Sequence, residues 1–225
     1  MGRILQSTGF ALVLALLLTA CGAPVGQAPA PSPSPQFHSR ILHIWPELEA
    51  VLRAYSWRPG CPVPIRDLRY IQVSHWTFDG RIATGEVIVH EGVTGQAVGL
   101  FADLFQLGFP IAQMRRIDDF AGSDDASMAA NNTSGFNCRK VAGTDRWSEH
   151  AYGRAIDVNP VQNPYVRGST VQPAAGRAYL DRSAYRPGML IAGRPEVAAA
   201  KRHSWGWGGD WTSSKDYQHL STTGR

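Results

Sequence analysis

The chain has 225 residues and a formal net charge of +4, with 44% apolar and 18% charged residues. This composition is sufficient for a buried core, and the length fits one domain with some additional sequence. The basic residues are scattered and lack the aromatic and basic patterns of nucleic-acid modules, so we expect no nucleic-acid partner. We also expect the protein to be a monomer.

The N-terminus has the features of an export signal. Arg3 precedes an apolar run from Phe10 to Leu18, which is much shorter than the roughly 20 residues of a membrane-spanning helix. The run ends in "LTAC", which resembles the bacterial lipobox, whose cysteine is acylated and becomes the first residue. We therefore expect a lipoprotein signal at 1–20 and a protein held outside the cytoplasm on the bacterial membrane by Cys21. The alternative is an ordinary cleaved signal with a chance cysteine.

Residues 21–36 contain "GAPVGQAPAPSPSPQ", which alternates proline with small residues and carries no charge. Such a segment favours extended polyproline conformations and cannot bury a core, so we interpret it as a spacer before a domain at 37–225. Export would also place Cys61 and Cys138 where disulfides persist, and with Cys21 lipidated they form an even pair. We favour a disulfide between them over two free buried thiols.

Helices and strands alternate along the domain. Apolar residues at helical spacing predict a helix from Ile41 to Tyr55, with Pro46 in a first turn or at a kink. "LRYIQVSHWTF" and "RIATGEVIVH" predict a β-hairpin whose turn contains Asp79-Gly80. A second helix is predicted through Ala97 and Leu104, ending before Gly108.

The second half of the domain gives weaker signals. "PIAQMRRI" predicts a strand, and the polar segment 118–133 has no defensible period and reads as a long loop. Ala155–Val158 predicts a short buried strand, and Pro195 can open a short helix. Together these elements predict an α+β fold, with a small antiparallel sheet and helices packed on it.

The stretch "SEHAYGRAIDVNP" places a histidine and an aspartate seven positions apart. A catalytic zinc site needs three protein ligands and an open position for water. His150 and Asp157 could supply two ligands, and His219 in "KDYQHL" a third, with Asp216 three residues before it. Taken singly, each histidine is more often structural than a ligand, so the prediction depends on the joint pattern.

This stretch resembles the SxHxxGxAxD signature of the zinc D-alanyl-D-alanine peptidases, a superfamily that includes vancomycin-resistance-type carboxypeptidases, phage peptidoglycan endopeptidases and the hedgehog signalling domain. "NNTSGFNCR", "GWGGDW" and "DYQH" also resemble its exported bacterial members, so the likeness extends from about Cys61 to His219. The resemblance implies one zinc ion per chain, in a cleft, bound by His150, Asp157 and His219.

The resemblance also implies catalytic roles. Asp216 would be the general base, where several relatives have Glu, and Arg139 in "FNCR" would be the cationic substrate residue. The match at Arg139 is loose, and Arg154 or Arg177 could take that role instead. Ser148 and His203 are candidates for neighbours that support the metal site, Ser148 by fixing the His150 ring.

Other polar and aromatic residues have competing interpretations. Asp210 is a second candidate for the base, whereas Asp124 and Asp125 read as a solvated loop pair. His75 and His90 lie on the predicted hairpin with their burial unknown. Three tryptophans could either line a substrate groove or pack in the core: Trp205, Trp207 and Trp211.

We therefore expect a membrane-anchored zinc metallopeptidase that cleaves the peptidoglycan stem peptide. The bond would be either D-Ala-D-Ala, cut by a carboxypeptidase, or an internal L,D bond, cut by an endopeptidase. One alternative is a non-catalytic module that binds a wall peptide or a partner, but such a module would have lost the base or a ligand. Another is a structural metal site, which would favour a closed shell of four ligands.

Overall fold

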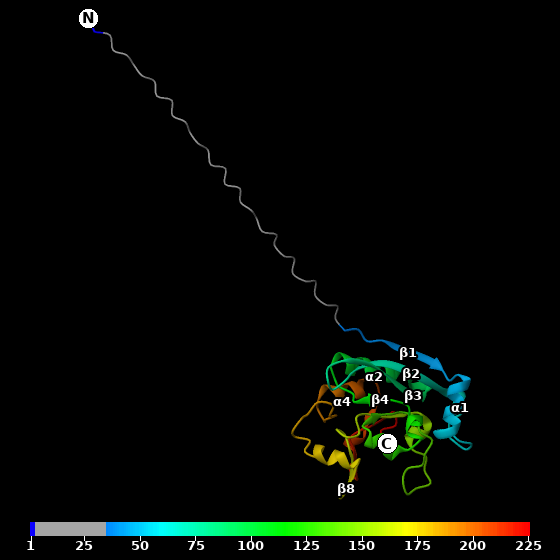
Figure 1. The fold of residues 1–225 in the computed structure, drawn as a ribbon. Helices are drawn as coiled ribbons and strands as arrows, with labels where there is room; N and C mark the ends of the chain where they lie inside the picture. Colours follow the sequence, from blue (N-terminus) through cyan, green and yellow to red (C-terminus); the bar gives the residue numbers. More distant parts are fainter. Residues whose placement is uncertain (3–34) are drawn as a thin grey trace. The chain divides into compact units, whose positions relative to one another are not determined.

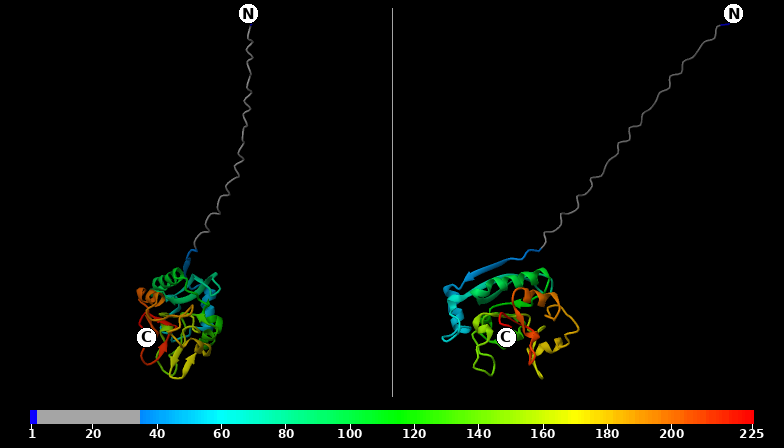
Figure 2. Two further views of the ribbon diagram at one scale, coloured as in Figure 1. Left: turned by 90° about the vertical axis from the view of Figure 1, so that its left-hand side faces the viewer. Right: turned by 180° about the vertical axis from the view of Figure 1, so that it is seen from behind.

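The computed structural model describes residues 1–2 and 35–225. The predicted signal, Cys21 and most of the spacer lie outside this range. Residues Gln36–Arg225 form one compact unit, and it has the α+β character that the sequence predicted. In Figures 1 and 2 the first sheet and α2 occupy one end of this unit, and the strands β7 and β8 the other. No helix in the described ranges combines the length and apolar character of a membrane span.

A three-stranded antiparallel sheet forms the first half of the unit. Its order is β1-β2-β3, from strands Ser39–His43, Leu68–Trp76 and Ile82–His90. The predicted hairpin is confirmed, with Asp79-Gly80 in the turn between β2 and β3. The predicted helix from Ile41 is wrong over its first residues, because Ile41 pairs with Ile71 as part of β1.

Three longer helices pack around this sheet. The helix α1 spans Pro46–Tyr55 and begins at the proline, which lacks an N–H that the first turn does not need. The helix α2 spans Thr94–Gln106, and α4 spans Pro195–Arg202, which confirms the helix predicted to open at Pro195. The α2 helix contacts both the sheet and α4.

Strands β2 and β3 carry buried residues on both faces, whereas β1 is mostly exposed, so alternate residues of β2 and β3 enter two different cores. Val73 and Val89 pack with α2 and with Ile156, Trp205 and Leu220 of the second half. Tyr70 and Ile88 point to the other face and pack with α1, Phe136 and Cys138. Because side chains alternate between the two faces of a strand, the hairpin contributes residues to both cores.

The second half contains short strands in small sheets. One sheet has the order β6-β11-β9, from Ala155–Asp157, His219–Ser221 and Gly206–Trp207, and β6 confirms the predicted strand. Another has the order β10-β7-β8, from Lys215–Asp216, Tyr165–Arg167 and Thr170–Gln172. Short 3-10 helices lie between the other elements, at Ile65–Asp67, Glu91–Val93, Ile117–Phe120, Glu149–Tyr152, Ala174–Tyr179 and Gly208–Asp210.

Two predictions for residues 110–133 are corrected. The strand predicted in "PIAQMRRI" is reduced to β4, Gln113–Met114, which pairs in parallel with β5, Asn132–Thr133. The predicted long loop contains the helix α3, Asp124–Ala129. Hydrogen bonds of polar side chains order this segment, since Ser123 caps α3 and Asn132 binds Ser127, and neither interaction leaves an apolar period in the sequence.

Gly153 connects the hairpin to the 3-10 helix Glu149–Tyr152. It ends that helix in the left-handed region, with φ +63°, and its carbonyl accepts a 2.8 Å hydrogen bond from the His90 amide. A Cβ atom at this position would lie 2.6 Å from the His90 nitrogen. Only glycine combines an easily adopted left-handed conformation with the absence of a Cβ atom, which explains the glycine of "HAYG".

We expect Gly153→Ala to lower the free energy of unfolding by about 2–4 kcal/mol, because it combines left-handed strain with a clash against backbone. The matched control is Gly143→Ala, where φ is +73° but a Cβ would meet nothing within 4 Å. That control should cost only about 1–2 kcal/mol. Denaturant unfolding of both variants measures the difference, and equal losses would contradict the close approach to His90.

Candidate metal centre

Three buried side chains from separate elements meet at one point. His150 lies in the 3-10 helix Glu149–Tyr152, Asp157 ends β6 and His219 begins β11. Asp157 and His219 are direct cross-strand partners. The Nδ1 atom of His219 lies 3.1 Å from Asp157 Oδ1, and the Nε2 atom of His150 lies 3.2 Å from Asp157 Oδ2. The structure therefore brings together the three residues that the sequence predicted as ligands.

Backbone carbonyl groups orient both imidazole rings. The Nδ1–H group of His150 donates to the Gly135 carbonyl at 2.7 Å, so Nε2 faces the carboxylate. The Nε2–H group of His219 donates to the Arg225 carbonyl at 2.8 Å, so Nδ1 faces it. Partners of this kind fix the tautomer and the direction of a ligating histidine.

The predicted supporting residues differ from the observed ones. Ser148 caps the 3-10 helix by accepting from the His150 amide at 3.3 Å, and it does not bind the ring. His203 lies elsewhere and pairs with Asp103 at 2.9 Å. The Gly135 carbonyl orients the His150 ring instead. A Cβ atom at this position would lie 2.4 Å from the Ile88 carbonyl oxygen, which explains why "TSGF" has a glycine here.

The geometry of this cluster fits a divalent metal ion. Its three ligand atoms lie within 4.8 Å of one another, and the set of two imidazole nitrogens and a carboxylate oxygen is one that zinc uses. Ligands about 2.0–2.2 Å from a tetrahedral ion are separated by roughly 3.3 Å. The separations of 3.1–3.2 Å observed here are close to that value.

The charges of the metal-free cluster compensate one another. Burial alone would raise the pKa of Asp157, but the charges and hydrogen bonds of His150 and His219 hold that pKa well below its usual range. Burial alone would lower the pKa of His219, but the hydrogen bond and charge of Asp157 raise it to about 9. Both ring nitrogens of His219 donate in this state, so a metal ion would replace its Nδ1 proton.

The cluster opens onto a cleft of about 1100 Å³. Trp211 lines this cleft and packs its ring 5.4 Å from that of His219, whereas Trp205 and Trp207 are core residues. His75 is buried on the hairpin, and the His90 ring accepts from the Gly92 amide. Of these aromatic candidates, Trp211 is therefore the one placed to contact a substrate.

Asp216 lies in the same cleft, on strand β10 opposite Tyr165. Burial, together with the negative charge of Asp157, raises the pKa of Asp216 to about 6. Its Oδ1 atom is buried and has no hydrogen-bond partner among the described residues. Asp210, the other candidate base, forms an exposed ion pair with Lys201 at 2.9 Å and does not line the cleft. The geometry thus favours Asp216 as the proton acceptor.

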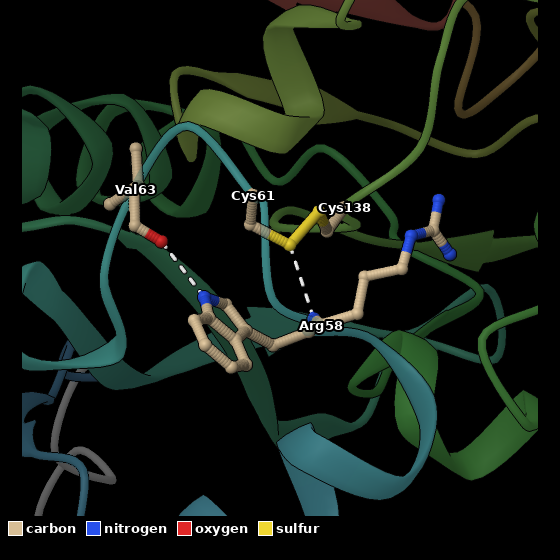
Figure 3. Close-up of a disulfide and its surroundings, with 5 residues drawn as sticks. Arg58, Cys61, Val63 and Cys138 are labelled. Carbon is tan, nitrogen blue, oxygen red and sulfur yellow. Dashed lines mark hydrogen bonds between the residues drawn. A yellow bond between two sulfur atoms is a disulfide. The ribbon is translucent and has the colours of Figure 1, made fainter.

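Arg139 also lines the cleft, and a disulfide holds the backbone next to it. Cys61 and Cys138 are joined with a Cα–Cα distance of 5.9 Å (Figure 3). The Cys138 amide donates to the Ser56 carbonyl at 2.9 Å, which ties this segment to the end of α1. Of the alternative arginines, Arg154 lines the cleft, whereas Arg177 is exposed and lies outside it.

The prediction of Asp124 as part of a solvated pair is wrong. Asp124 begins α3, lines the cleft and forms an ion pair with Arg139 at 2.8 Å, while Asp125 is exposed. Burial raises the pKa of the Asp124 carboxyl group. The available signal was Ser123, a helix-capping residue directly before two acidic residues of a first turn.

A family comparison agrees with this geometry. Residues 142–222 match the family model described as D-alanyl-D-alanine carboxypeptidase. This segment is therefore similar to that peptidase family. The match covers roughly a third of the chain and includes the three candidate ligands and Asp216, but not Arg139 or the two disulfide cysteines. Searches of curated proteins and of solved structures gave no match.

We expect His150→Ala and His219→Ala to lose stoichiometric metal, because each removes one of three ligands from the carboxypeptidase-like cluster. His203→Ala is the matched control, since its imidazole pairs with Asp103 away from the cluster. Elemental analysis of the purified variants gives the metal content per chain. Full metal content in either ligand variant would contradict the assignment.

We expect zinc affinity to rise about tenfold per pH unit between pH 7 and 8.5, because the ion must displace the His219 proton. The His219 pKa is raised from 6.5 to about 9, so this pair stabilises the metal-free protein fully below pH 6.5 and progressively less as pH rises through 9. Calorimetry in buffers of different ionisation enthalpy should detect about one proton released per zinc. An affinity independent of pH over this range would rule out a protonated His219.

Proposed function

We propose that this protein is a zinc metallopeptidase that hydrolyses a peptide bond of the peptidoglycan stem peptide. The observation that carries the proposal is the buried cluster of His150, Asp157 and His219, beside Asp216 at the base of a cleft, within a segment similar to the D-alanyl-D-alanine carboxypeptidase family. A cluster of three ligands lining a cleft favours a catalytic over a closed structural site.

A zinc ion bound by these residues would lower the pKa of a coordinated water and polarise the substrate carbonyl group. Asp216 would accept a proton from the attacking water and return it to the leaving amine. A pKa of about 6 suits this exchange, because the carboxylate is ionised at neutral pH yet remains basic enough to hold a proton. Arg139 would bind either a terminal carboxylate or the oxygen that gains negative charge.

The proposal leaves two possible bonds within one substrate class. A carboxypeptidase would cut D-Ala-D-Ala and need the free carboxylate of the terminal residue, for which Arg139 supplies a guanidinium in the cleft. An endopeptidase would cut an internal L,D bond and be insensitive to that carboxylate. The charge of the peptide terminus therefore distinguishes the two.

We also propose that the protein acts outside the cytoplasm as a monomer anchored through a lipidated Cys21. The support is the lipobox-like "LTAC" and the proline-rich spacer that follows it. A spacer of this composition would extend from the membrane and allow the domain to reach the wall. Mass spectrometry of the mature N-terminus would detect diacylation of Cys21.

Purified protein without residues 1–20 should cleave defined muropeptides, and a chelator should abolish the cleavage. Mass analysis of the products identifies the bond. Amidating the terminal carboxylate should strongly reduce kcat/KM for a carboxypeptidase and leave an endopeptidase nearly unchanged. Metal-loaded protein that cleaves none of the stem peptides would refute the proposed function.

We expect Asp216→Ala to keep its metal and lose about 10²-fold or more in kcat, because a general base contributes to turnover and not to metal binding. The matched control is Asp210→Ala, which removes an exposed carboxylate of the same segment and should retain activity. Metal content and steady-state rates are measured on both variants. Loss of metal from Asp216→Ala would make it a ligand, and full activity would exclude it as the base.

A further inference from the structure

The ion pair between Asp124 and Arg139 is sheltered from solvent. The Nη2 atom of Arg139 lies 2.8 Å from Asp124 Oδ2, and the two side chains are only 29% and 28% exposed, respectively. The Nε atom of Arg139 is buried and has no hydrogen-bond partner among the described residues. Fully exposed ion pairs contribute little, but this guanidinium is partly shielded from solvent and has Asp124 as its charge partner.

Both ends of this ion pair have an anchored backbone. Arg139 follows Cys138, whose disulfide and amide hydrogen bond tie it to Cys61 and Ser56. Asp124 starts α3, which Ser123 caps by accepting from the Ala126 amide at 3.2 Å. The Arg139 side chain therefore extends from an anchored backbone, and its guanidinium contacts Asp124 of α3, which is anchored independently.

The ion pair involves Nη2, and the guanidinium has N–H donors on its other nitrogens that remain for a ligand. Both residues line the cleft that contains His150, Asp157 and Asp216. An arginine that is free to rotate would lose side-chain entropy when it binds substrate. An arginine already held by Asp124 would have lost part of that freedom before the substrate arrives.

We propose that Asp124 is a positioning residue, which holds the Arg139 guanidinium in the cleft with its remaining donors directed at the substrate. This inference rests on the proposed peptidase function. It also assigns a role to a residue outside the segment that matches the carboxypeptidase family. The Asp124 carboxylate partly neutralises the positive charge of Arg139. It therefore weakens the attraction of Arg139 for an anionic group, and in return fixes the orientation of the guanidinium.

The kinetic test uses Asp124→Asn, with Asp125→Asn as the matched control in the same turn of α3. Asp125 is exposed, so its variant should behave as wild type. Asp124→Asn should keep its metal and lose about 10- to 100-fold in kcat/KM on stem peptides, because a misplaced group can cost this much. In an Arg139→Ala background, Asp124→Asn should cause no further loss. Independent, multiplicative losses would overturn the proposal.

A second measurement does not depend on activity. In the ¹⁵N-labelled full chain, the guanidinium NMR signals of Arg139, assigned with Arg139→Lys, should show slow rotation that becomes fast in Asp124→Asn and stays slow in Asp125→Asn. Unchanged rotation in Asp124→Asn would overturn the positioning role. If the wild type cleaves no stem peptide, the proposed function fails, and the guanidinium signals still decide whether Asp124 fixes Arg139.

Discussion

The pairing of β6 with β11 is the constraint on which the site depends. Asp157 and His219 are opposite each other in this pair, and so are Ile156 and Leu220. Because neighbouring side chains of a strand point to opposite faces, the apolar pair enters the core while the polar pair faces the cleft. Ser134 exchanges two backbone hydrogen bonds with Asp157 on its other side. A shift of one residue would bury the ligands in the core and expose the apolar pair.

This arrangement places a carboxylate where it needs a cation. Burial of an unpaired charge is costly, and in the metal-free protein the imidazole groups of His150 and His219 compensate Asp157. A metal ion would take over the same carboxylate and both imidazole nitrogens. Exchange of the His219 proton for a divalent metal ion would raise the net charge of the cluster by one, beside the carboxyl group of Asp216, and the carbonyl groups of Gly135 and Arg225 would hold the rings in either state.

Local patterns in the sequence predicted the parts of the structure that depend on local chemistry. The hairpin around Asp79-Gly80, the helix opened by Pro195 and the strand at Asp157 are of this kind. The joint motif also indicated the three ligands. The helix α3 was missed, since it has six residues and no apolar period, although Ser123 marks its start. The sequence also did not show the roles of Gly135 and Asp124, because each depends on a partner distant in the chain. A carbonyl group that supports a histidine, or a carboxylate that pairs with an arginine, leaves no periodic pattern.

The residues of the proposed mechanism come from two parts of the chain, of which only one matches the family model. The segment matched to the carboxypeptidase family supplies the metal ligands and Asp216. The preceding segment supplies Arg139 and Asp124. The Cys138 disulfide ties it to Cys61, the Cys138 amide ties it to Ser56 at the end of α1, and the Phe136 amide ties it to Ile88 of β3. In the proposed mechanism the first set would activate the water, whereas Arg139 of the second would bind the terminal carboxylate or the oxygen that gains negative charge. The two parts are nevertheless joined directly, because the Gly135 carbonyl holds the His150 ring and the His150 carbonyl accepts from the Asn137 amide, so a shift of the Arg139 segment would also move a candidate metal ligand.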